Sequence, residues 1–150
     1  MTTSERTAVR AHTDDVVGRR VYTGLTGLTA LAVLLQGVWA GLFLQHDGQR
    51  DVAAGWIVLH ARDGEVAIAL AVLAAGWALI RLRSRRDLVI GAIVLAVLLV
   101  VEAYLGGLIY LDGVTALTPV HVPLALLIMG LAVWLPLRAS EWPGGRASGR

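Results

Sequence analysis

The chain has 150 residues, of which 57% are hydrophobic and 16% charged, and its net charge is +2. Its mean hydropathy of +0.70 is too apolar for a soluble domain of this length and indicates a membrane protein. Because the chain has no cysteine, disulfides, thiolate chemistry and cofactor attachment through cysteine are excluded. Any metal must therefore be held by histidine, carboxylate or amide groups.

Four apolar blocks follow one another along the chain, over residues 21–44, 53–80, 88–111 and 115–137. Each has the roughly 20 residues that a helix needs to cross a bilayer. The connections around 81–87 and at Asp112-Gly113 are short, which forces neighbouring helices to run antiparallel. The sequence predicts an all-α fold, a four-helix up-down-up-down transmembrane bundle over residues 19–138. The polar segments 1–18 and 139–150 are expected to be disordered cytoplasmic tails.

The arginines cluster on one side of the predicted bundle. Eleven of the 13 basic residues lie on that side, and the other two, Arg50 and Arg62, lie opposite. The positive-inside rule then places both termini in the cytoplasm, and the expected location is the inner membrane of the cell. The arginines are interpreted as signals of orientation, so no nucleic-acid partner is expected. The eleven are Arg6, Arg10, Arg19, Arg20, Arg81, Arg83, Arg85, Arg86, Arg138, Arg146 and Arg150.

The two halves of the chain resemble each other. Residues 36–42 (QGVWAGL) correspond to residues 102–108 (EAYLGGL), each segment is followed by an Asp-Gly pair, and a histidine-bearing helix then begins. This pattern predicts a duplicated helical hairpin. Gln36 and Glu102 each follow an arginine by 16 residues, which puts both about 24 Å along their helices. They are expected to lie level in the bundle.

Two histidines, His60 and His121, lie inside apolar blocks, near the starts of the second and fourth helices. An ionisable side chain in a membrane is costly and usually has a partner. Three interpretations are open: a neutral imidazole bonded to a neighbouring helix, ligation of one haem iron by both histidines, and a proton relay that includes Glu102. The helical rise puts the two histidines about one turn apart in depth.

Other residues near the histidines are candidates for the same site. Gln36, Gly64 and Glu102 are expected to line it, and Arg50 to pair with a haem propionate. Asp63 is a candidate acceptor that orients the His60 imidazole. Glu102 is expected to be protonated, paired with a histidine or arginine, or bonded to Gln36 as a link between helices. The helix face that contains His60 also carries small residues, namely Gly64, Ala67, Ala71 and Ala74. Small residues there indicate either close helix packing or room for a flat cofactor.

The pattern resembles one half of the haem A synthase family. The matching positions are His60 in residues 56–62 (WIVLHAR) and His121 in residues 118–123 (TPVHVP), with the Gly-Leu ends of the first and third helices. It is also similar to small four-helix membrane proteins of actinobacteria with a Gln, His, Gln or Glu, His order. The resemblance implies a histidine ligand on the second and fourth helices. The glutamate that the synthases carry before the first histidine is missing here, as is the second four-helix half, so haem A synthesis by this chain alone is not expected.

The sequence therefore predicts a membrane protein that binds one b-type haem through His60 and His121, for electron transfer or haem handling. The alternative is a cofactor-free structural or assembly protein in which the intramembrane polar residues only fix helix packing. No catalytic residue is assigned, and whether the chain is an enzyme stays open. The expected partners are membrane lipid and either a second copy of the chain or a respiratory-chain protein.

Overall fold

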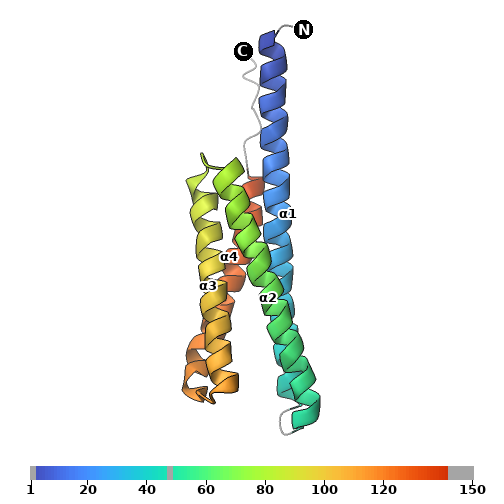
Figure 1. The fold of residues 1–150 in the computed structure, drawn as a ribbon, viewed down its shortest axis with the longest axis vertical. Coiled ribbons are helices and arrows are strands. Elements are labelled where there is room, and N and C mark those ends of the chain that lie inside the picture. Colours follow the sequence, from blue (N-terminus) through green and yellow to red (C-terminus); the bar gives the residue numbers. More distant parts are fainter. Residues whose placement is uncertain (1–2, 47–48, 142–150) are drawn as a thin grey trace.

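The protein is a bundle of four long helices, shown in Figure 1. The computed structural model describes residues 3–46 and 49–141, with the side chains of 3–4, 7–15 and 50 outside this description. Within that part, four α-helices and one short 3-10 helix account for the fold: α1 (Thr3–Gln45), α2 (Arg50–Arg81), α3 (Arg86–Leu111), η1 (Thr115–Leu117) and α4 (Thr118–Ser140). All four α-helices are long and apolar enough to cross a membrane, as predicted, and the protein is a multi-pass membrane protein.

Each helix packs against two neighbours, in the cyclic order α1, α2, α3, α4. The turn between α3 and η1 contains Gly113, whose φ of 70° favours glycine because a side chain is rarely tolerated there. Pro119 lies in the first turn of α4, where the missing amide hydrogen has no partner in the helix. Pro123 and Pro136 lie inside α4 without ending it. The up-down-up-down arrangement is confirmed.

The N-terminal end differs from the expectation. Because α1 begins at Thr3, residues 3–18 continue the first helix where a disordered tail was predicted. No glycine or proline interrupts this polar segment before Gly18, so nothing in it stops helix propagation from the apolar part. At the other end, α4 runs to Ser140, and residues 142–150 of the expected C-terminal tail lie outside the described residues.

The buried core occupies one half of the bundle, next to the cluster of arginines that we call the arginine-rich end (Arg19, Arg20, Arg81, Arg83, Arg85, Arg86 and Arg138). Small residues let the helices approach closely there, and Ala67, Ala71, Ala74 and Ala132 are fully buried. These alanines therefore serve helix packing, one of the two alternatives drawn from the sequence. Larger side chains complete the core: Tyr22, Leu88, Leu95, Ile128 and Leu135 are its largest buried apolar members.

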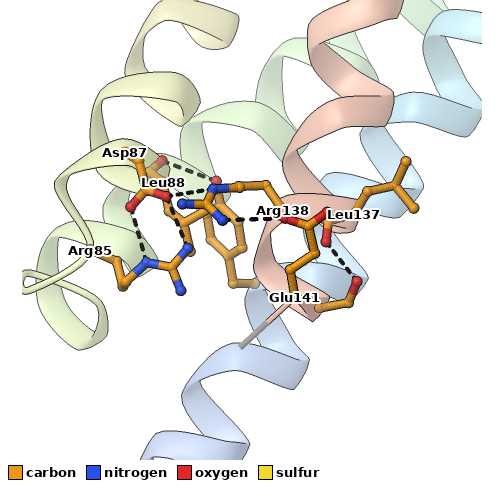
Figure 2. Close-up of polar contacts among 8 residues, drawn as sticks. Arg85, Asp87, Leu88, Leu137, Arg138 and Glu141 are labelled. Atoms are coloured by element: carbon orange, nitrogen blue, oxygen red, sulfur yellow. Dashed lines mark hydrogen bonds and ion pairs between the residues drawn. The ribbon is translucent and has the colours of Figure 1, made fainter. Parts of the chain in front are cut away.

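Polar bonds fasten the helices together at the arginine-rich end. The Tyr22 hydroxyl donates to the carbonyl oxygen of Leu88 at 3.0 Å, which links α1 to α3. Asp87 accepts from Arg85 at 2.9 Å and lies 3.0 Å from Nε of Arg138, which links α3 to α4 (Figure 2). Tight packing, a hydrogen bond and ion pairs therefore hold the helices together at this end of the bundle.

The opposite half, which we call the histidine end, is built differently. Among the described residues, none is buried beyond Val33 in α1, before Ala67 in α2, beyond Leu99 in α3 or before Ile128 in α4. In Figure 1 the α1–α2 hairpin and the α3–α4 hairpin separate toward this end. The polar intramembrane residues therefore lie where the two hairpins are not joined by a shared core.

Candidate functional site

His60 on α2 is held by the backbone of α1. Its Nδ1 atom lies 3.1 Å from the carbonyl oxygen of Gln36. Because a carbonyl oxygen only accepts, the imidazole must carry its proton on Nδ1 to form this bond. The ring also meets Phe43 edge to face, with ring centroids 5.6 Å apart. Its Nε2 atom has no hydrogen-bond partner among the described residues and keeps a lone pair.

The side chain of Gln36 on α1 also contacts α2. Its Nε2 donates to the carbonyl oxygen of His60 at 2.8 Å and to Oδ2 of Asp63 at 2.9 Å. The same Asp63 oxygen accepts from the Trp39 indole at 3.1 Å. Asp63 therefore bonds Gln36 and Trp39, and the group that orients the His60 imidazole is the Gln36 carbonyl instead. Gly64 lies beneath the Gln36 amide, since a Cβ atom built on it would be 3.6 Å from Oε1.

The second hairpin contains a matching pair. Nδ1 of His121 on α4 lies 3.1 Å from Oε1 of Glu102 on α3, and the two side chains are 21% and 13% exposed. The alignment does not satisfy hydrogen-bond geometry, so both carboxylate oxygens and Nδ1 are buried without a hydrogen-bond partner in the described part of the chain. The bond between Glu102 and Gln36 that the sequence left open is therefore not formed. Glu102 is paired with a histidine, one of the predicted outcomes.

Glycine makes room for the His121 ring. A Cβ atom built on Gly106 would lie 3.3 Å from Cε1 and 3.9 Å from Nε2 of His121. Gly106 follows Glu102 by one helical turn, so the carboxylate and the bare glycine backbone share one face of α3. Sequence reasoning missed Gly106 as a site residue, because glycines are frequent in this chain and only its position opposite His121 sets it apart.

The two hairpins repeat the same arrangement. In each, the polar residue of the first helix lies against Nδ1 of the histidine on the second helix, through a backbone carbonyl in one case and a carboxylate in the other. Both pairs lie at the histidine end, outside the buried core of each helix, so they belong to the same half of the bundle. The predicted duplication is thus reproduced at the level of side-chain contacts.

The remaining predicted residue, Arg50, begins α2, and its side chain lies outside the described residues. Its pairing with a haem propionate stays a prediction. Two aromatic residues unassigned from the sequence lie beside the His60 pair, where Trp39 stacks on Trp56 with centroids 6.0 Å apart. Tryptophan near the end of an apolar block is common at membrane interfaces, and only the structure shows the bond from Trp39 to Asp63.

The donor set limits the kind of metal centre that this region can form. In the described part of the chain, no group of three or more histidine, aspartate or glutamate side chains is arranged to hold a metal ion. A metal bound by protein side chains alone is therefore not supported here. Two imidazoles are enough for haem iron, because the porphyrin supplies the other four nitrogen ligands.

Comparison of the chain with protein families, with curated proteins and with solved structures finds no match. The resemblance to one half of the haem A synthase family therefore stays a prediction.

Proposed function

We propose that the protein binds one b-type haem at the histidine end, that His60 and His121 would hold its iron, and that it serves electron transfer or haem handling. The observation that carries this proposal is the similar placement of the two imidazoles, of which His60 forms a hydrogen bond through Nδ1 and His121 only approaches a carboxylate. Each has Nδ1 facing an acceptor on the neighbouring helix, at 3.1 Å in both cases. Histidine ligands of metals typically use one ring nitrogen for such an acceptor, which leaves the other for the metal.

Three further features fit a flat cofactor. The histidine half has no fully buried residue in the described chain, so its packing leaves more freedom than the tight alanine core of the other half. Glu102 and His121 have buried polar atoms without hydrogen bonds, which is uncommon in a finished protein interior. Gly106 presents no side chain to the His121 ring, where a Cβ atom would lie 3.3 Å from Cε1.

Each residue has a definite part in this proposal. His60 and His121 would hold the iron through Nε2, with the Gln36 carbonyl oxygen 3.1 Å from Nδ1 of His60 and a Glu102 carboxylate oxygen 3.1 Å from Nδ1 of His121. An acceptor at Nδ1 makes a ligating imidazole more basic. The Gln36 amide and Gly64 support the α1–α2 pairing from which His60 projects. A bound haem would supply one-electron redox chemistry. We place the arginine-rich end in the cytoplasm, so the haem would lie near the outer face of the inner membrane.

A second candidate function rests on the bonds of Gln36. Because its amide joins α1 to both the backbone and a carboxylate of α2, the polar residues have a sufficient structural use without any cofactor. In this case the protein would be a structural or assembly component of the membrane, with a second copy of the chain or a respiratory-chain protein as its partner.

A visible absorption spectrum distinguishes the two candidates. The protein is purified in detergent from cells that have sufficient haem, and its absorbance is recorded beside those of the His60→Ala and His121→Ala variants. Haem ligation predicts a Soret band that both substitutions remove or shift. A colourless but fully helical parent protein would contradict the haem proposal and favour the structural candidate.

A further inference from the structure

A separate concave site lies at the arginine-rich end, between α1 and α4. A cavity of about 270 Å³ is lined by Arg19, Arg20 and Thr23 from α1 and by Ser140 from α4. This is many times the space that a single water molecule requires. Among the described residues, its lining side chains belong to two arginines, one threonine and one serine, and none of them carries a carboxylate.

The two arginines of this cavity differ from the other arginines nearby in their partners. Arg85 and Arg138 both contact Asp87, and Arg138 also lies 3.2 Å from Glu141 (Figure 2). Arg19 and Arg20, in contrast, make no hydrogen bond or ion pair with any described residue. Two adjacent cations without a counter-charge in the described chain thus line the same hollow. Asp87 and Glu141, two described acidic residues at this end of the bundle, are already paired with Arg85 and Arg138.

The site lies at the level where a membrane boundary is expected. The candidate membrane span of α1 begins at Val16, only a few residues before Arg19, and Val17 and Val21 on either side of the two arginines are exposed. At the same level, the Trp77 indole donates to the carbonyl oxygen of Gly18 at 2.8 Å, and tryptophan is enriched at membrane interfaces. A ligand in this cavity would therefore lie among lipid headgroups.

We propose that this cavity binds a phosphate group of negative charge, as carried by the headgroup of an anionic phospholipid. Arginine matches phosphate oxygens with a planar fork of donors, and basic pockets between membrane helices are suited to such headgroups. The Ser140 hydroxyl already donates to the carbonyl oxygen of Leu137, so the two guanidinium groups and the Thr23 hydroxyl are the donors for the phosphate. A lipid held here would contact both α1 and α4, the first and last helices of the bundle.

The test uses the full chain in a neutral detergent, titrated separately with phosphatidylglycerol, phosphatidylcholine and inorganic phosphate, with bound ligand counted by native mass spectrometry. Saturable binding of phosphatidylglycerol, with phosphatidylcholine much weaker, is the expected result. Binding of inorganic phosphate with equal affinity would assign the site to a free phosphate and contradict the lipid assignment. Lack of saturable binding for all three ligands would overturn the proposal.

Substitutions of Arg19 and Arg20 test whether the lipid binds in this cavity. Arg19→Gln combined with Arg20→Gln should weaken phosphatidylglycerol binding about thirtyfold, the change expected from two basic residues at an anionic surface. The matched control combines Arg83→Gln with Arg86→Gln, which removes the same charge from exposed positions at the same end of the bundle. An equal loss in both double variants would show a diffuse charge effect and would overturn the proposal. Circular dichroism confirms that each variant is helical.

Discussion

The carbonyl oxygen of Gln36 lies 3.1 Å from Nδ1 of His60, while the side-chain amide of Gln36 donates to the carbonyl oxygen of His60 at 2.8 Å. One residue thus contacts the other twice, once through its backbone and once through its side chain. The orientation of the imidazole depends on the backbone contact, which no substitution of the Gln36 side chain removes directly.

Because the backbone and side-chain contacts of Gln36 are separate, a substitution of the side chain should remove only one of them. Gln36→Leu should lower the free energy of unfolding by about 1 kcal/mol, the size of a hydrogen bond between membrane helices, yet keep the haem ligands. Denaturation in detergent measures the first effect, and the Soret absorbance measures the second. Gln45→Leu, at an exposed position at the end of α1, is the control. Complete loss of haem from a stably folded Gln36→Leu protein would show that the amide itself holds the cofactor.

Glu102 should affect the binding of haem more than the fold. Glu102→Gln keeps the size of the side chain but replaces the carboxyl group that faces Nδ1 of His121 with an amide, which has only one acceptor oxygen. Disruption of such a supporting contact usually lowers metal affinity about 10-fold to 100-fold, and a haem titration of the apoprotein measures this change. Glu65→Gln is the control, because Glu65 is exposed and pairs with Arg62. Equal affinities for the parent and the Glu102→Gln protein would remove Glu102 from the site.

Two adjacent glycines on α3 provide a matched test of space beside His121. Gly106→Ala places a Cβ atom 3.3 Å from Cε1 of the ring, whereas a Cβ on Gly107 has nothing within 4 Å. Both substitutions improve helix propensity by about 1 kcal/mol, so their effects on the helix are similar. Gly106→Ala should change the spectrum of the bound haem, and Gly107→Ala should leave it unchanged. Identical spectra for the two variants would mean that the His121 ring does not occupy this position in the holoprotein.

The close packing of α3 against α4 at the arginine-rich end can be tested by substitution. A Cβ atom on Gly91 would lie 2.6 Å from Cδ2 of Leu135, which is fully buried. Gly91→Ala should therefore lower the free energy of unfolding by about 1–3 kcal/mol through overpacking between α3 and α4. Gly130→Ala, with nothing within 4 Å, is the control. A Gly91→Ala protein as stable as the parent would show that the two helices adjust without cost.

The sequence was sufficient to predict the four spans, the up-down-up-down order and the duplicated hairpins, because apolar length and the repeated segments carry that information directly. The pairing of Glu102 with a histidine was one of several alternatives that the sequence left open. The sequence did not identify the acceptor of His60, because every residue has a backbone carbonyl and none is marked in the sequence. The sequence also did not show that the buried core lies in only one half of the bundle. Gly64 near His60 and Ala67 about one turn further are both small residues, but only Ala67 is buried.

The central claim is that His60 and His121 bind one iron from two different hairpins. Electron paramagnetic resonance of the oxidised protein, with haem and protein quantified in the same sample, tests it most directly. The proposal predicts one haem per chain and a single low-spin ferric signal that is lost in both His60→Ala and His121→Ala but kept in His46→Ala, whose imidazole bonds the carbonyl oxygen of Leu42. A preparation without haem, or a low-spin signal that survives either of the first two substitutions, would contradict it.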